Sequence, residues 1–295
     1  MMTPSGGARG FGAGRTKGDV TMTTMSYARE ADRLTGEEVT GAARPLDLTD
    51  LTGDWISLTG LGGGVASYRA RVCDDGSLAV SARGQGEPRP GAWGEAPAHA
   101  YAKALRSREC MAFTATFEGP RTTSTLEGYL AVGVVTGHVF HRFTDGPGWR
   151  DYFSREFYVS ADGRQPEPPG DFPDALRSGS NDPSELLGTW TCLAPAAAKS
   201  VAALECGLVD GEFTVRADGF GADGPVDWGT TSAALYADGA HPDYPPAFLA
   251  TFDHGYMRVH LQGRINRGIL VICEFTQFTD DSGRSDYFIR ECYHR

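Results

Sequence analysis

The chain contains FTDGPGWRDYFSREFY at residues 143–158 and a second version of that stretch, FTDDSGRSDYFIRECY, at residues 278–293. The two versions lie 135 residues apart, and the same offset, applied without a gap, aligns the residues before them. The aligned pairs include Leu51/Leu186, Gly53/Gly188, Trp55/Trp190, Trp93/Trp228, Phe113/Phe248 and Gly128/Gly263. One ungapped offset predicts a duplicated module. Because the period is far longer than that of a solenoid repeat, each copy is expected to be a small domain.

The repeat divides the 295 residues into four parts. We expect residues 1–45 to be disordered apart from a short helix near residues 27–34, with Met22 or Met25 as candidate start sites. Residues 46–160 are the first copy and residues 185–295 are the second. The polar, proline- and glycine-rich residues 161–184 are expected to form a linker between the copies.

Each copy has the pattern of short strands separated by turn residues. Residues 112–117 run into a Glu-Gly-Pro turn, and the equivalent residues 247–252 run into Asp-His-Gly. No segment of helical periodicity separates the strands that follow, which predicts an antiparallel meander. Because such a sheet must cover its edges, we expect an all-β protein built from two tandem antiparallel up-and-down barrels of about seven or eight strands each.

Two further features resemble the lipocalin and wider calycin barrels. A Gly-x-Trp motif opens the first strand of each copy, at Trp55 and Trp190, and an arginine lies in each last strand, at Arg155 and Arg290. In those barrels the tryptophan closes one end and the arginine packs across it. The resemblance therefore implies that Arg155 stacks on Trp55 and that Arg290 stacks on Trp190.

The amino-acid composition limits the classes of partner that the chain is expected to bind. The net charge of −11 and the pI near 5.1 argue against nucleic acid and anionic membranes as partners. No apolar run is long enough to span a bilayer, and the N-terminal segment does not resemble a secretory signal, so we expect a cytoplasmic protein. The six cysteines have no pairing under the repeat and no Cys-x-x-Cys spacing, so neither disulfides nor a metal site are expected.

Residues present in both copies are interpreted first as structural. Alternation along the last strand places Tyr152, Glu156 and the equivalents Tyr287 and Glu291 on one face. That face is either a hydrogen-bonding wall with Glu156 and Glu291 as catalytic acids, or the outer surface of the barrel, which we favour. Trp93 and Trp228 are either lids over a ligand or, as we prefer, plugs of the barrel mouth. Four aspartates, Asp145, Asp151, Asp280 and Asp286, are interpreted as turn residues rather than cation ligands.

Positions that differ between the copies are freer to serve a ligand. His138 and Arg142 share a face of one strand, with His141 on the other face, and the second copy has Cys273 and Gln277 at the positions of His138 and Arg142. A histidine beside an arginine can orient a carboxylate or enolate and move a proton, although an exposed polar strand face explains the pattern equally well. His254 and His260 are expected to face solvent.

Three functions are compatible with these residues. The first is a cofactor-independent cyclase or isomerase of a hydrophobic small molecule, plausibly in natural-product biosynthesis. Its catalytic candidates are His138, Arg142, Glu156 and Glu291, and its ligand-binding candidates are Trp93, Trp228, Tyr152, Tyr287, His141 and Gln277. The second is a carrier or sensor of a hydrophobic ligand, and the third is an interaction module whose barrels are filled by their own side chains. A cavity between the copies is an alternative location for the site.

Overall fold

The computed structural model describes residues 45–295 except 60–62, 87, 145–148, 165, 167, 169–170, 172, 178–179, 195–199 and 222–223. The helix expected near residues 27–34 and the turn residue Asp145 lie outside the described residues. The regular structure of the described residues consists of sixteen strands and two short 3-10 helices, η2 (Thr49–Leu51) and η3 (Asp174–Arg177), and includes no α-helix. The expectation of an all-β protein is confirmed.

The first eight strands form a closed antiparallel ring, here called ring 1. Its members are β1 (Gly53–Ser57), β2 (Val65–Val72), β3 (Leu78–Gly84), β4 (Gly91–Ala102), β5 (Cys110–Glu118), β6 (Thr122–Ala131), β7 (Val134–Phe143) and β8 (Tyr152–Ser160). Each strand pairs with the next, and β8 pairs back with β1, where Trp55 faces Ser160. Chain order is therefore also the order around the ring, as a meander requires.

The last eight strands repeat this arrangement as ring 2. Its members are β9 (Gly188–Cys192), β10 (Val201–Val209), β11 (Glu212–Gly221), β12 (Gly224–Asp238), β13 (Ala247–Asp253), β14 (Met257–Asn266), β15 (Ile269–Phe278) and β16 (Tyr287–His294). Closure again comes from the first and last strands, with Tyr293 of β16 opposite Cys192 of β9. The strand pairings of the two rings thus follow the repeat seen in the sequence.

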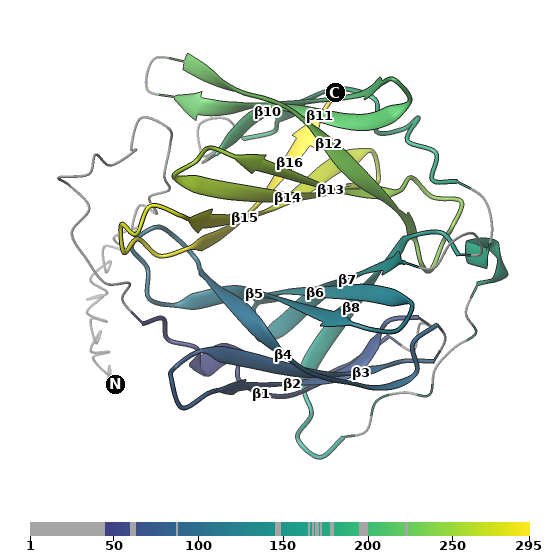
Figure 1. Ribbon diagram of the computed structural model, residues 1–295, viewed down its shortest axis with the longest axis vertical. Helices are drawn as coiled ribbons and strands as arrows, with labels where there is room; N and C mark the ends of the chain where they lie inside the picture. Colours follow the sequence, from purple (N-terminus) through teal and green to yellow (C-terminus); the bar gives the residue numbers. More distant parts are fainter. Residues whose placement is uncertain are drawn as a thin grey trace, which may run out of the picture.

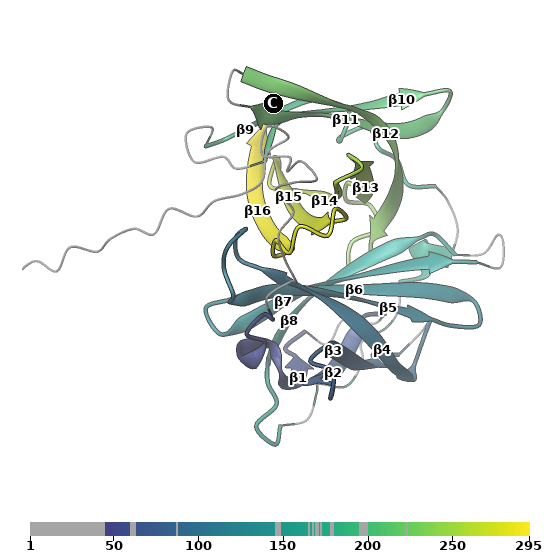
Figure 2. The same ribbon diagram turned by 60° about the vertical axis from the view of Figure 1, so that its left-hand side comes forward.

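The two rings pack through the outer faces of β5–β8 and β13–β16, which lie across from each other in Figures 1 and 2. Two short parallel pairings join the rings into one sixteen-stranded sheet. Ala102 of β4 pairs with Tyr287 of β16, and Ala237 of β12 pairs with Tyr152 of β8. These contacts are equivalent under the 135-residue offset. The copies therefore meet in a self-complementary way, like the subunits of a two-fold symmetric dimer.

Aromatic and aliphatic side chains pack the interior of each ring. In ring 1 the buried cluster includes Trp55, Tyr68, Phe113 and Leu126, and ring 2 has an equivalent cluster around Trp190. Trp55 donates its indole N–H to the carbonyl of Leu51, at 3.1 Å, as Trp190 does to Leu186, at 2.8 Å. The Gly-x-Trp tryptophans thus tie the start of each ring to its core.

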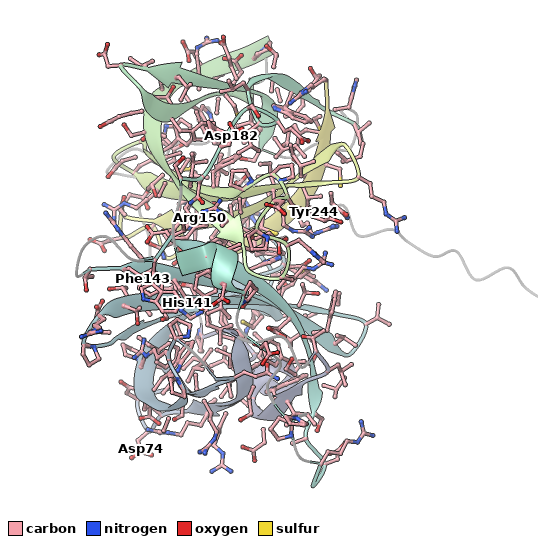
Figure 3. The ribbon with its side chains drawn as sticks, turned by 90° about the vertical axis from the view of Figure 1, so that its right-hand side faces the viewer. Asp74, His141, Phe143, Arg150, Asp182 and Tyr244 are labelled. Atoms are coloured by element: carbon pink, nitrogen blue, oxygen red, sulfur yellow. The ribbon has the colours of Figure 1, made fainter. Side chains whose placement is uncertain are left out.

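Asn181, near the end of the linker, contacts both rings. The side-chain amide of Asn181 donates to the carbonyls of Asp151 in ring 1, at 3.1 Å, and Leu235 in ring 2, at 2.8 Å, while its oxygen accepts from Nε of Arg150. Figure 3 shows Arg150 at the level where the rings meet. One linker side chain therefore bridges both copies.

The repeated aspartates act as turn residues, as expected. A carboxylate oxygen of Asp151 accepts from the backbone N–H of Phe143 at 2.9 Å, and Asp286 does the same for Phe278 at 2.7 Å. Asp280 accepts from the backbone N–H of Ser282 and pairs with Arg284. Each closing hairpin is therefore held at its base by an aspartate.

Candidate functional site

The polar face of strand β8 points into the interior of ring 1. Tyr152, Ser154, Glu156 and Tyr158 alternate along the strand and are each at most 4% exposed. Our preference for the outer surface of the barrel as the location of this row is therefore wrong. On the other face of β8, Phe153 packs against Tyr236 of ring 2, while Arg155 is half-buried. Alternation alone identified the two faces but not which one points inward.

Glu156 is the central group of this row. One carboxylate oxygen, Oε2, accepts from the hydroxyl of Ser57 at 2.7 Å and from the hydroxyl of Thr59. Among the described residues, the other oxygen, Oε1, is buried without a hydrogen-bond partner, as is the hydroxyl of Ser154 two residues away. Burial raises the pKa of Glu156 to about 7, although the two hydroxyl donors act in the opposite direction. At neutral pH this carboxyl is present in both protonation states.

His141 lies beside this carboxyl row, on the inner face of β7. Its Nδ1 is 2.9 Å from the hydroxyl of Ser124, and its ring stacks on Tyr152 with centroids 4.6 Å apart. Trp93 meets the same imidazole edge to face at 5.6 Å. Burial, and secondarily the charge of Arg89, lowers the pKa of His141 to about 3, so the imidazole is neutral at physiological pH. Figure 3 shows His141 within ring 1.

Arg89 completes this group. Its guanidinium lies over the Trp93 ring at 4.8 Å and donates to the Ser124 hydroxyl at 3.1 Å and to the carbonyl of Phe117 at 2.8 Å. The Trp93 indole donates in turn to the Arg89 carbonyl at 2.8 Å. Trp93 is therefore packed inside the ring. We call Trp93, His141, Tyr152, Ser154 and Glu156 the ring 1 cluster.

The arrangement of the ring 1 cluster suits proton transfer. A carboxyl with a pKa near neutrality can both accept and donate a proton at working pH, and Oε1 of Glu156 has no other partner in the described residues. His141 adds a neutral imidazole to the cluster, while the hydroxyls of Tyr152 and Tyr158 donate to the carbonyls of Gly63 and Val65. The apolar surroundings strengthen each of these interactions.

Ring 2 does not reproduce this cluster. Tyr287 is buried and packs on Ile289, which occupies the position of Ser154, and Trp228 packs on Phe252 and His254. Glu291 is half-buried and accepts from the Tyr293 hydroxyl at 3.2 Å. Tyr287, Trp228 and Glu291 thus lie with ring 2, apart from the ring 1 candidates.

Ring 2 carries a buried acid of its own, which the sequence analysis missed. Glu274 on β15 is 3% exposed and accepts from the Thr276 hydroxyl at 2.9 Å. Burial raises its pKa to about 8. The first copy has Val139 at the equivalent position. Glu274 is therefore one of the positions at which the copies differ, where we expected functional residues. The same holds for Ser57 and Ser154, which face Cys192 and Ile289 in the second copy.

Three predicted residues lie on the outer side of the rings. His138 is buried between the copies, while Arg142, expected to act with it, is exposed. Gln277 donates to the hydroxyl of Tyr101 across the same interface at 2.7 Å. His138 and Arg142 do share a strand face opposite His141, as predicted. His260, expected to face solvent, instead pairs with Glu127 of the other copy at 3.1 Å.

The arginine packing implied by the lipocalin resemblance is wrong for Arg155 and Arg290. Arg155 lies over Phe157, at 5.2 Å, on the outer face of β8, whereas Trp55 is inside the ring. The cation over Trp190 is Arg295, at 4.5 Å, and the equivalent position in the first copy is Ser160. The alternation of β8 and β16 places Arg155 and Arg290 on the face away from the tryptophans.

No group of three or more potential metal ligands is found among the described residues. Nor does the described part of the chain contain a helix long and apolar enough to cross a membrane. The six cysteines are free thiols. Comparisons with protein-family models, with curated proteins and with solved structures found no match.

Proposed function

We propose that this chain is an enzyme that isomerises or cyclises a small, largely apolar molecule by proton transfer at the ring 1 cluster. The observation that carries the proposal is Glu156, a buried carboxyl whose pKa is raised to about 7 and whose Oε1 has no partner in the described residues. Perturbed carboxyls of this kind in apolar surroundings are typical of general acids and bases.

The chemistry needs only this chain's own groups. The Glu156 carboxylate removes a proton from a carbon next to a carbonyl, leaving an enolate, and the carboxylic acid then returns that proton to another carbon of the same molecule. In a cyclisation the enolate carbon instead attacks an electrophilic carbon within the molecule, and the proton goes to the group that gains the electron pair. Neutral His141, whose Nε2 has no partner among the described residues, donates a hydrogen bond to the developing oxyanion, and the Tyr152 ring stacks on its imidazole.

We propose further that each ring is a lipocalin-like barrel and that the protein works in the cytoplasm. Strand order, ring closure and the Gly-x-Trp motif of each copy support the first statement, and the free thiols support the second. The deep interior of both rings is packed by its own side chains, as expected for an interaction module. We place the ligand at the polar row of ring 1, where Oε1 of Glu156, Nε2 of His141 and the Ser154 hydroxyl have no partner among the described residues.

The test uses 5-nitrobenzisoxazole, a flat apolar probe whose ring opens when a base removes its C–H proton. We expect the wild-type rate to rise with pH around a midpoint of about 7, and Glu156→Gln to lose at least about 100-fold in rate. Glu291→Gln is the matched control, because this carboxyl occupies the equivalent position in ring 2 but is half-buried and bonded to Tyr293.

Equal rates for the wild type and Glu156→Gln would contradict catalysis at this cluster. Native mass spectrometry of protein purified from its own host then separates the remaining functions. A co-purifying apolar metabolite that Trp93→Ala releases would identify a non-catalytic carrier. Absence of any bound metabolite, together with equal rates, would leave the interaction module.

A further inference from the structure

The interface between the copies has a polar centre. Across β6, β7 and β8, the outward-facing residues Glu127, His138 and Arg155 are direct neighbours in register. The equivalent row of ring 2, across β14, β15 and β16, is Gln262, Cys273 and Arg290. Glu127, His138, Gln262 and Cys273 are each at most 1% exposed. Two polar rows are thus buried between the rings.

Aromatic clusters flank this centre on both sides. Tyr101 and Tyr129 of ring 1 pack with Phe275 and Phe288 of ring 2, and the rings of Tyr129 and Phe288 stack at 5.0 Å. On the other side, Phe140 and Phe153 of ring 1 pack with Tyr236 of ring 2, in the arrangement that the repeat relates to the first. These clusters hold the rings together and keep the polar centre in an apolar environment.

Positive charge collects at the centre without compensation. Arg264 on β14 is 8% exposed, and its burial, followed by the charges of Arg155 and Arg290, lowers its pKa. The same three guanidinium groups lower the pKa of His138, after burial. None of the three arginines forms an ion pair or a side-chain hydrogen bond with any described residue, whereas Arg69, Arg71, Arg216, Arg258 and Arg284 all do.

The one carboxylate in these rows is already engaged. Oε1 of Glu127 pairs with Nε2 of His260 at 3.1 Å, and its Oε2 is buried without a partner. Other polar groups are left over around it, since Nε of Arg264, Nε2 of His138 and the side-chain amide of Gln262 are also buried with no partner among the described residues. Three arginines facing one carboxylate in a protein of net charge −11 is an excess that an anion would balance.

We propose that the interface between the two rings binds a small anion with two or more carboxylate or phosphate groups, held by Arg155, Arg264 and Arg290. Planar guanidinium groups bind both kinds of oxyanion through paired hydrogen bonds. Arg290 is exposed and Arg155 half-buried, so the β8 and β16 side is the route of entry. Arg155 and Arg290 are equivalent under the repeat, which places one guanidinium from each copy around the anion.

Isothermal titration with citrate and, separately, with pyrophosphate tests this site, with sodium chloride at matched ionic strength as the reference. We expect one of the two anions to bind with a stoichiometry of one per chain and to raise the melting temperature. Arg264→Gln and Arg290→Gln should each weaken that binding by at least tenfold. Arg290 is exposed, so its variant is expected to fold even if Arg264→Gln does not.

Arg258→Gln is the matched control, because this exposed arginine lies on the same strand as Arg264 but pairs with Asp253. It should leave the affinity unchanged. Saturating anion should also shift the imidazole C–H signals of His138 in the NMR spectrum and leave those of exposed His99 in place. The proposal is overturned if neither anion binds more tightly than chloride, or if Arg258→Gln weakens binding as much as Arg290→Gln.

Discussion

Packing between a glycine and an aromatic ring explains why some residues are the same in both copies. Phe113 lies directly opposite Gly128 on the neighbouring strand, and Phe248 lies opposite Gly263. A Cβ added at Gly128 would come within 2.5 Å of the Phe113 ring, and one at Gly263 within 2.2 Å of the Phe248 ring. Each phenylalanine therefore covers the bare backbone of a glycine inside its ring, and the pair is retained in both copies.

Gly128→Ala should destabilise the protein for this reason. Because the Phe113 ring is buried and cannot move aside freely, we expect a loss of about 1–3 kcal/mol in the free energy of unfolding, measured by urea denaturation. Gly207→Ala is the control, since its added Cβ would only reach ordinary contact with Thr214 at 3.8 Å. A Gly128→Ala variant as stable as Gly207→Ala would show that the ring is not packed as described.

Glu156 makes stability depend on pH in a defined direction. Its pKa is about 7 when folded and near 4.5 when unfolded, so folding favours the protonated form. Below about pH 4.5 the carboxyl is protonated in both states and does not lower the free energy of unfolding. As the pH rises to about 7, the penalty for burying its charge grows and the free energy of unfolding falls. That shift corresponds to a maximum of about 3 kcal/mol. Urea denaturation at pH 5 and pH 8 should therefore show that Glu156→Gln loses less stability than the wild type between these values. Parallel pH profiles would refute the assignment.

The hairpins show what sequence could establish about individual elements. Asp151 and Asp286 were identified as turn residues from their position between strands, and each accepts a backbone N–H at the base of its hairpin. The residues on the two faces of β7 were also assigned correctly, because the alternation of side chains along a strand does not depend on tertiary structure. The face of β8 that points into the ring was predicted wrongly. Its inner row contains the charged residue Glu156 and its outer row the apolar residue Phe153, which is the reverse of the usual distribution. Phe153 is apolar on the outside because ring 2 covers it.

The site could be predicted only in part for the same reason. Trp93, His141, Tyr152 and Glu156 were candidates and lie together, but nothing in a strand pattern shows that Ser57, from the first strand, reaches Glu156 on the last. Ring closure brings these two residues together. His138 was separated from this group because its strand face belongs to the interface, and sequence alone does not say which surface a second domain will cover.

At the scale of the whole molecule, the two copies contribute different charged groups to their interface. A symmetric pair of second copies would bring Arg264 and Arg290 together twice, with Gln262 in place of a carboxylate. A symmetric pair of first copies would instead bring two Glu127 against two Arg155 and replace Arg264 by Tyr129. The pairing of one first copy with one second copy has an intermediate balance of charge, with Glu127 bonded to His260 of the other copy.

Separately expressed copies should therefore behave differently. Because the interface is self-complementary and its aromatic clusters would be exposed, we expect residues 45–177 to form a homodimer, with its charges balanced by Glu127 and Arg155. Residues 180–295 should dimerise more weakly, since four arginines would meet without a carboxylate, and this difference should grow at low ionic strength. Size-exclusion chromatography with light scattering measures both. Mixing the two fragments should yield the one-to-one complex in preference to either homodimer. Equal self-association of the two fragments would show that the aromatic clusters alone determine the pairing.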